Sequence, residues 1–584
     1  VEGYTTDIAS FYYYNDDDIT MLTEAKGKSE EEQLEIINKV IDSMTLTELC
    51  QMTGGATSQD LIPLNSGAEG RTWGIPRLGI PQNMLSDGPA GLRHKKLSTA
   101  LMSWAGLAST WDVDAYEAAG ELVGNEAKYY GVDIVLAPGL NIQRNPLGGR
   151  NFEYMSEDPV VSGEAAAGYI RGIQSKGVGV AAKHFVANEQ ETNRQQGNSI
   201  VSERALREIY MAPFERIVED DPWTIMTSYN KLNGVQTAAD PWLLEEVARD
   251  EWGFEGYFMT DWGATPTGAP LIEAGNDMQQ SGNSYVALVN WINEEGIEET
   301  ERERRLERTK DAVRNILKGV LKTPSFNGEY DDLTPSIVNS RSYDFYTNPE
   351  SPYAESKEKN FEIATGGIVL MKNDNDALPR TGNTKFALVS SSVARTYANR
   401  GATWGDPGTS AVEDLIIEGG GSGHVYFKDA GTLKEALESR DGFSVPYAAV
   451  DADIAADAQA EAEKAVAATD AGIMVFSRAA TEGSDNAVST YALSDDEKAV
   501  LEAFGAAYKA AGKPLICLIN SGSAISVVEM NENADAILDV WMPGSQGPAA
   551  IAAILSGEVN PSGKLAQGFP VTYEHSPSII MGNQ

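Results

Sequence analysis

The chain has 584 residues, and 45 Lys and Arg against 86 Asp and Glu give a formal net charge of −41. Nucleic acids and anionic membranes are bound by clustered basic side chains, so neither is an expected partner, and no apolar run approaches the roughly 18 residues of a membrane span. Two cysteines and four histidines exclude a disulfide framework, a zinc ribbon and a histidine-rich metal site, so we expect no metal or cofactor.

Residues 1–28 show no clear period and are interpreted as an N-terminal extension, consistent with the end of an upstream domain that is missing here. Because Val1 is not an initiator methionine, the removal of a leader peptide stays an open alternative. A soluble, cytoplasmic protein is favoured over a secreted one. Two capping boxes follow, Ser29 with Glu32 and Thr45 with Glu48. Each predicts the start of a helix.

Between residues 130 and 275, short apolar runs alternate with long amphipathic stretches. The runs are 132–136, 178–182, 223–226 and 256–259. They are too short for helices and lack polar alternation, which is typical of parallel strands buried on both faces. Polar residues follow each run, and in a (β/α)-barrel the carboxyl ends of the strands form one functional rim. The pattern predicts a TIM-like barrel over residues 29–322, ending in a charged helix.

Residues 323–358 contain several prolines and little periodicity, and they are the predicted linker. Apolar runs at 386–389, 472–476, 515–519 and 536–540 then alternate with helical stretches, one of them opened by the capping box of Ser494 and Glu497. Residues 359–584 are therefore predicted to form a second α/β domain with a mostly parallel sheet. The glycine-rich segment 419–423 lacks the spacing of a dinucleotide site.

Without a metal, a cofactor loop or a cysteine nucleophile, the candidate reactive groups are carboxylates, Lys, His and Tyr. A pair of carboxylates flanking a sugar acetal is enough to hydrolyse it. Over roughly residues 40–570, the chain resembles glycoside hydrolase family 3, β-glucosidase branch. The matching segments include Ser86-Asp87-Gly88-Pro89, Arg144-Asn145-Pro146, Gly149-Arg150-Asn151, Lys183-His184-Phe185, Glu191-Thr192-Asn193-Arg194, Ser228-Tyr229-Asn230, Thr260-Asp261-Trp262 and Asn560-Pro561-Ser562-Gly563.

The resemblance implies a barrel followed by an α/β sandwich, with the active site between them. It makes Asp261 the nucleophile, in agreement with its place after an apolar run, although an Asp there could also cap a helix. It makes Glu482 the acid/base, within the segment Glu482-Gly483-Ser484-Asp485-Asn486. Asn486 stands where the family usually has arginine, which leaves the anchoring of this loop open.

The resemblance also assigns residues that bind the sugar. Asp87 would accept hydrogen bonds from the hydroxyls at positions 4 and 6, and Tyr229 would hydrogen-bond the nucleophile. The other positions matching the sugar-binding site are Arg150, Lys183, His184, Arg194, Trp262 and Ser422. Alone, each of these residue types is more often a surface, capping or core residue. The segment 274–282 departs from the family pattern by losing a Met and a Pro.

The expected activity is retaining, exo-acting hydrolysis that releases β-D-glucose from a small oligosaccharide or an aryl β-glucoside. A β-xylosidase or an α-L-arabinofuranosidase of the same family is an alternative, although Asp87 favours a hexose. A second alternative is a sugar-binding protein without catalytic activity. The sequence leaves a homodimer open, and many relatives carry a fibronectin-like domain that is absent here or lies outside the given residues.

Overall fold

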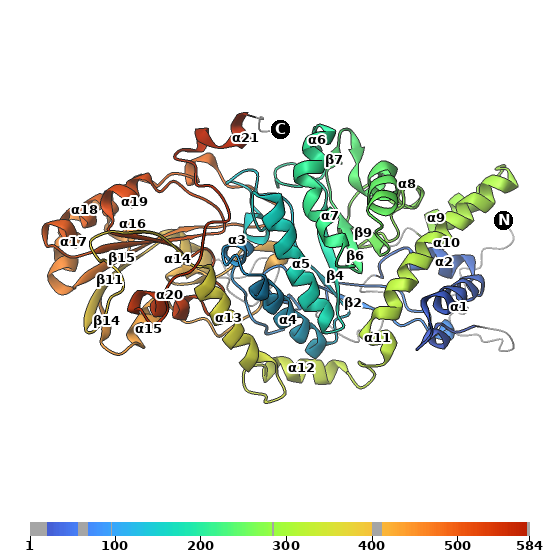
Figure 1. Ribbon diagram of the computed structural model, residues 1–584, viewed down its shortest axis with the longest axis horizontal. Coiled ribbons are helices and arrows are strands. Elements are labelled where there is room, and N and C mark those ends of the chain that lie inside the picture. The colour runs from blue at the N-terminus through green and yellow to red at the C-terminus, as the bar shows by residue number, and fades with distance from the viewer. Residues whose placement is uncertain (1–19, 57–67, 95, 283–284, 400–410, 581–584) are drawn as a thin grey trace.

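The computed structural model describes residues 20–56, 68–94, 96–282, 285–399 and 411–580. Two α/β units lie side by side in it, each built on its own sheet (Figure 1). Of the predicted N-terminal extension, residues 1–19 lie outside the described residues. A 3-10 turn, Leu22–Ala25, follows them and buries Leu22 against the core of the first unit.

The sheet of the first unit has the strand order β1-β2-β3-β4-β6-β9. Its strands are β1 (Gly70–Arg71), β2 (Met84–Asp87), β3 (Ile134–Leu136), β4 (Gly179–Phe185), β6 (Thr224–Thr227) and β9 (Tyr257–Thr260). The strands from β2 to β9 are parallel, whereas β1 is antiparallel to β2. Single bridges join Met259 to Met278, Gly54 to Gln279 and Gly55 to Thr72. They close the sheet into an irregular barrel.

Helices cover the outside of this barrel (Figure 1). They include α1 (Glu30–Asp42), α2 (Leu46–Met52), α4 (Val113–Tyr130), α5 (Pro159–Ser175), α7 (Ala212–Val218), α8 (Ala269–Ala274) and α10 (Glu299–Lys322). Both predicted capping boxes are formed: Ser29 accepts the main-chain N–H of Glu32, and Thr45 accepts that of Glu48. Within the described ranges, no helix combines the length and apolar composition that crossing a membrane requires.

The connection to the second unit is partly helical, although its sequence shows little periodicity. It contains α11 (Pro324–Asn327) and α12 (Pro335–Tyr343) and leads into α13 (Tyr353–Gly367). Tyr330 donates to the carbonyl of Val132 at 2.9 Å, so the segment is attached to the barrel. The domain boundaries at residues 322 and 359 stay predictions.

The second sheet has the strand order β10-β17-β16-β15-β11-β14. Its strands are β10 (Val369–Asn373), β17 (Ala536–Asp539), β16 (Leu515–Ser521), β15 (Ala471–Arg478), β11 (Thr384–Ser390) and β14 (Phe443–Val450). All neighbours are parallel except β10 and β17. Helices α17 (Ala458–Ala468), α18 (Asp495–Ala510) and α19 (Val528–Asn533) pack on one face, and α15 (Leu433–Glu438) and α20 (Gly547–Ser556) on the other (Figure 1). The predicted α/β class, a barrel followed by a sandwich, is confirmed.

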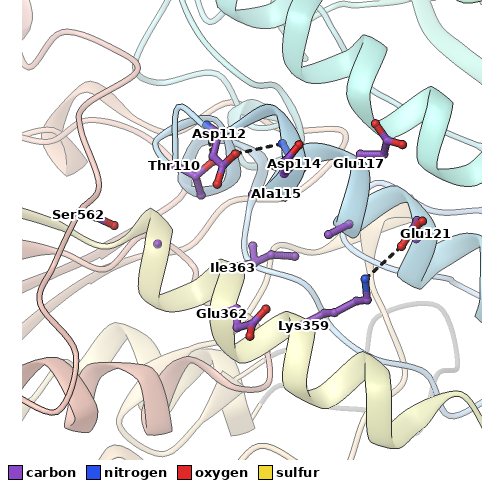
Figure 2. Close-up of a pocket in the computed structure, with 12 residues that line it drawn as sticks. Thr110, Asp112, Asp114, Ala115, Glu117, Glu121, Lys359, Glu362, Ile363 and Ser562 are labelled. Carbon is purple, nitrogen blue, oxygen red and sulfur yellow. Dashed lines mark hydrogen bonds and ion pairs between the residues drawn. The ribbon is translucent and has the colours of Figure 1, made fainter.

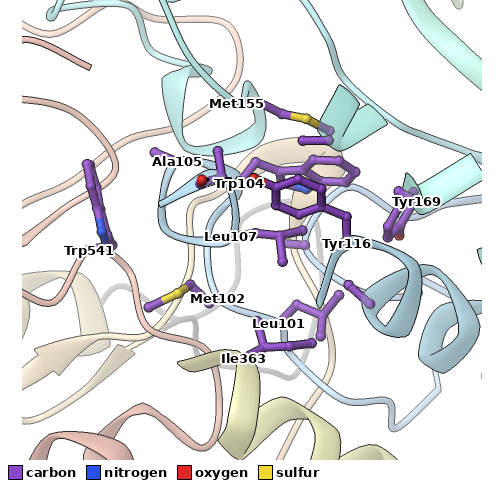
Figure 3. Packing of buried hydrophobic residues seen from close by; sticks show 14 of the residues in the cluster. Leu101, Met102, Trp104, Ala105, Leu107, Tyr116, Met155, Tyr169, Ile363 and Trp541 are labelled. Atoms are coloured by element: carbon purple, nitrogen blue, oxygen red, sulfur yellow. Dashed lines mark hydrogen bonds between the residues drawn. The ribbon is translucent and has the colours of Figure 1, made fainter. Parts of the chain in front are cut away.

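A single hydrophobic core continues from one unit into the other (Figure 3). Trp104, in the short helix α3 (Trp104–Ala108) of the barrel unit, packs edge-on against Tyr169 and donates its indole N–H to the carbonyl of Pro89. Trp541 of the second unit is fully buried in the same cluster and donates to the carbonyl of Gly367 at 3.1 Å. Because both units bury side chains in this cluster, their relative position is held by apolar packing.

Candidate active site

A cavity of about 430 Å³ lies where the carboxyl ends of the barrel strands meet two loops of the second unit. Every residue that the sequence predicted for the site lines it: Asp87, Arg150, Lys183, His184, Arg194, Tyr229, Asp261, Trp262, Ser422 and Glu482. Asp87 ends β2, Lys183 and His184 belong to β4, and Tyr229 and Asp261 follow β6 and β9. Parallel strands bring these side chains to one rim, as the sequence predicted.

Asp261 directly follows β9 and is 7% exposed. Its Oδ1 accepts the main-chain N–H of Trp262 at 2.7 Å, and its Oδ2 lies 3.5 Å from His184 Nε2. Among the described residues, Oδ2 accepts no hydrogen bond. Burial raises the pKa of Asp261, and the charge of Glu482 adds to this, while Arg150 and Lys183 oppose it. The backbone thus orients the carboxylate while one oxygen stays available to react.

Glu482 reaches the cavity from the loop that follows β15. Its Oε1 lies 2.8 Å from Arg194 Nη1 and 3.6 Å from Arg150 Nη1, and its Oε2 accepts the main-chain N–H of Ser422 at 2.8 Å. Burial favours the neutral form, but the two guanidinium groups and the Ser422 N–H outweigh it and hold the pKa of Glu482 well below its usual range. The carboxyl is therefore ionised near neutral pH when the cavity is empty.

The cavity also contains a buried acceptor between two cations. Asp87 Oδ1 lies 3.5 Å from Lys183 Nζ, and Asp87 Oδ2 lies 3.2 Å from Arg93 Nη1. Burial raises the pKa of Asp87, and Lys183 and Arg93 counteract this. The pKa of Asp87 still lies at about 7, above its usual range, and its carboxyl oxygens can accept hydrogen bonds from sugar hydroxyls.

Tyr229 and Trp262 line the cavity next to Asp261. The Tyr229 hydroxyl donates to the carbonyl of Trp262 at 2.9 Å. The hydroxyl also lies close enough to the Asp261 carboxylate to interact with it, and its hydrogen bond to the nucleophile stays a prediction. Burial raises the pKa of Tyr229, and the nearby Asp261 carboxylate raises it further. The Arg194 guanidinium lies over the Tyr229 ring, 4.7 Å from its centre.

Several residues at the site were not singled out from the sequence. Arg93 and Glu69 line the cavity and form an ion pair at 2.8 Å. Arg93 lies 6 positions after Asp87 in the chain, whereas no signal pointed to Glu69. The loop of Glu482 has Asn486 in place of the family's usual arginine, and Asp485 anchors it instead. The Asp485 carboxylate accepts main-chain hydrogen bonds from the barrel unit.

A second cavity, of about 520 Å³, lies between α4 and α13 (Figure 2). Five carboxylates line it, and Lys359 pairs with one of them, Glu121, at 3.0 Å. All of its ionisable side chains are at least partly exposed, and it is separate from Asp261 and Glu482. Within the described ranges, no three His, Cys, Asp or Glu side chains are grouped to hold a metal ion.

Comparison with known proteins gives consistent matches over both units. The glycosyl hydrolase family 3 N-terminal domain matches residues 22–289, and the glycosyl hydrolase family 3 C-terminal domain matches residues 368–583. An exo-α-(1→6)-L-arabinopyranosidase of Bifidobacterium longum is 33% identical over 568 residues, which cover 92% of this chain and 67% of that one. Thermostable β-glucosidase B of Acetivibrio thermocellus is 32% identical, with 93% and 67% covered. The solved structure of β-glucosidase 3B from Thermotoga neapolitana in complex with α-D-glucose has a TM-score of 0.79 at 34% identity, covering 94% and 78%.

Proposed function

The chain belongs to glycosyl hydrolase family 3, and we propose that it is a retaining, exo-acting β-D-glucosidase that releases terminal glucose from β-glucosides. One observation carries the proposal: Asp261 of the barrel unit and Glu482 of the second unit face the same cavity. Two carboxyl groups on opposite sides of a sugar ring are what double displacement at an acetal carbon requires. No cofactor enters this reaction.

In the first step, Asp261 attacks the anomeric carbon, and the bond to the leaving oxygen breaks as Glu482 transfers its proton to that oxygen. Asp261 Oδ2 is free of hydrogen bonds from the described residues, which suits a nucleophile. Glu482 must first take up a proton. Because the pKa of Glu482 is lowered and that of Asp261 is raised, the form with Glu482 protonated and Asp261 ionised is the smaller fraction of the singly protonated pair, and this fraction is the one that reacts.

In the second step, a water molecule gives a proton to Glu482 and its oxygen attacks the anomeric carbon. The ester bond to Asp261 breaks, glucose leaves with its original β configuration, and both carboxyl groups return to their starting state. The buried guanidinium of Arg150 and the ammonium of Lys183 lower the pKa of Asp261 and so favour its ionised form as the leaving group. Arg150 is itself held by a salt bridge to Glu153.

The choice of glucose rests on Asp87, whose buried carboxylate offers an acceptor for the hydroxyls at one end of the sugar. A pentopyranose lacks the hydroxymethyl group whose hydroxyl would donate a hydrogen bond to Asp87. The second candidate substrate is an α-L-arabinopyranoside, because the relative from Bifidobacterium longum is named as an exo-α-(1→6)-L-arabinopyranosidase.

A panel of 4-nitrophenyl glycosides tests the substrate: β-D-glucoside, β-D-xyloside, α-L-arabinopyranoside and α-L-arabinofuranoside. We expect the highest kcat/KM for the β-D-glucoside, and NMR should show β-glucose as the first product. A preference for a pentoside would reassign the substrate. Early α-glucose would refute retention. Glucose binding by calorimetry without any turnover would indicate a sugar-binding protein instead.

A further inference from the structure

We propose that Asp485 and Glu191 form an interdomain lock that positions Glu482 for proton transfer. Asp485 belongs to the loop of the second unit that carries Glu482, and Glu191 belongs to a loop of the barrel unit. Neither lines the cavity, so both are positioning residues. The inference rests on the proposed function, because it concerns the acid/base of that reaction.

Asp485 binds the barrel unit through three main-chain N–H groups. Its Oδ1 accepts from Gly149 and from Glu191, both at 3.0 Å, and its Oδ2 accepts from Thr192 at 2.8 Å. The donors come from two separate barrel loops. Hydrogen bonds to an ionised acceptor are about twice as strong as neutral ones, so this one carboxylate fixes both barrel loops to the loop of Glu482.

Glu191 makes the reciprocal contact from the barrel side. Its Oε2 accepts the main-chain N–H of Gly483 at 2.6 Å and a hydrogen bond from Arg194 Nη1 at 2.7 Å. The same Arg194 nitrogen lies 2.8 Å from Glu482 Oε1. The Glu191 side chain is only 1% exposed. Glu191 therefore holds both the backbone next to Glu482 and the guanidinium that contacts its carboxylate.

Two glycines leave the loop of Glu482 little room to shift. A Cβ atom on Gly149 would lie 2.0 Å from the carbonyl oxygen of Ser484. A Cβ atom on Gly421 would lie 2.4 Å from the Cβ of Glu482. The barrel thus packs directly against the backbone of the loop, and the glycine-rich segment packs against the other side of Glu482.

Loss of the lock should impair proton transfer more than sugar binding, because a displacement of about 1 Å can cost about 10²-fold in rate. A phenol leaving group needs a proton, whereas 2,4-dinitrophenolate leaves without one. For Asp485→Ala we expect kcat/KM on phenyl β-D-glucoside to fall by about 10²-fold, mainly through kcat. On 2,4-dinitrophenyl β-D-glucoside we expect a much smaller loss.

The matched control is Glu157→Ala. Glu157 also crosses between the units, accepting the main-chain N–H of Gly568 at 2.7 Å, but this partner lies outside the loop of Glu482. We expect Glu157→Ala to leave unchanged the ratio of kcat/KM on phenyl β-D-glucoside to kcat/KM on 2,4-dinitrophenyl β-D-glucoside. Asp485→Asn keeps one acceptor oxygen and should give a smaller loss with the same selectivity; it replaces Asp485→Ala if that variant fails to fold. In a Glu482→Ala background, Asp485→Ala should add no further selective loss.

An equal loss on both glucosides, no loss on either, or the same selectivity in Glu157→Ala would overturn the lock. These outcomes differ from failure of the proposed function itself. If the proposed function is wrong, the unmodified protein will itself hydrolyse neither glucoside.

Discussion

At the scale of single residues, the proposed reaction depends on how Asp261 and Glu482 influence each other. The Glu482 charge raises the pKa of Asp261, whereas Arg150 and Arg194 hold the pKa of Glu482 below its usual range. The reactive form needs Asp261 ionised and Glu482 protonated. The pair therefore titrates as a unit, and the limbs of the pH–rate profile belong to both groups.

Glu482→Gln should shift the acidic limb of kcat/KM to lower pH when 2,4-dinitrophenyl β-D-glucoside is the substrate. This leaving group needs no acid, so the limb reports ionisation of Asp261. Activity rises as pH increases through the pKa of Asp261, and removal of the neighbouring negative charge lowers that pKa. Measured kcat/KM profiles of the two proteins check this. An unchanged limb, or one moved to higher pH, would refute the electrostatic coupling.

At the scale of elements, much of the fold and site follows from local sequence. The strands β3, β4, β6 and β9 coincide with apolar runs. The reactive side chains of the barrel unit lie at the carboxyl ends of these strands or just after them. By contrast, β2, which carries Asp87, has only two apolar residues in Met84–Asp87 and no period to detect. The bridges that close the barrel involve single residue pairs, which leave no pattern in a sequence.

Local sequence patterns also do not predict the contacts of the interdomain lock. Asp485 and Glu191 are separated by 294 positions in the chain, and their bonds involve main-chain N–H groups that any residue type supplies. Sequence patterns predict which residues enter a rim or a loop. Which loops then meet depends on how the two units pack, and that is set by the shared core.

Ser494→Ala tests a predicted element without touching the site. Ser494 accepts the main-chain N–H of Glu497 at 3.2 Å and caps α18, on the outer face of the second sheet. Loss of this cap should lower the free energy of unfolding by about 1 kcal/mol, with kcat/KM unchanged. Urea unfolding measures the difference. The exposed Ser489, changed to Ala, is the control, and equal stability of all three proteins would contradict the capping role.

At the scale of the whole molecule, the catalytic pair is divided between two units, so their packing determines its geometry. The core that contains Trp104 and Trp541 extends through both (Figure 3). Because neither unit can unfold without exposing apolar surface of the other, we expect the described part of the chain to unfold as one cooperative structure.

Trp541→Ala should lower the free energy of unfolding by about 3–5 kcal/mol, because it leaves a cavity in this shared core. Tyr343→Ala, at a side chain that is 86% exposed, should change it by no more than about 0.5 kcal/mol. Calorimetry and urea unfolding measure both, and the unmodified protein should show one transition. Two separate transitions in that protein would contradict a core shared between the units.

The most direct measurement is to trap the intermediate and find where the sugar is attached. The protein is incubated with 2,4-dinitrophenyl 2-deoxy-2-fluoro-β-D-glucoside, which forms a slowly hydrolysed glycosyl ester, and its peptides are analysed by mass spectrometry. We predict one fluoroglucosyl group per chain, on the peptide that contains Asp261, and none in Asp261→Asn. A label on another residue, or turnover of this reagent by Asp261→Asn, would contradict the account.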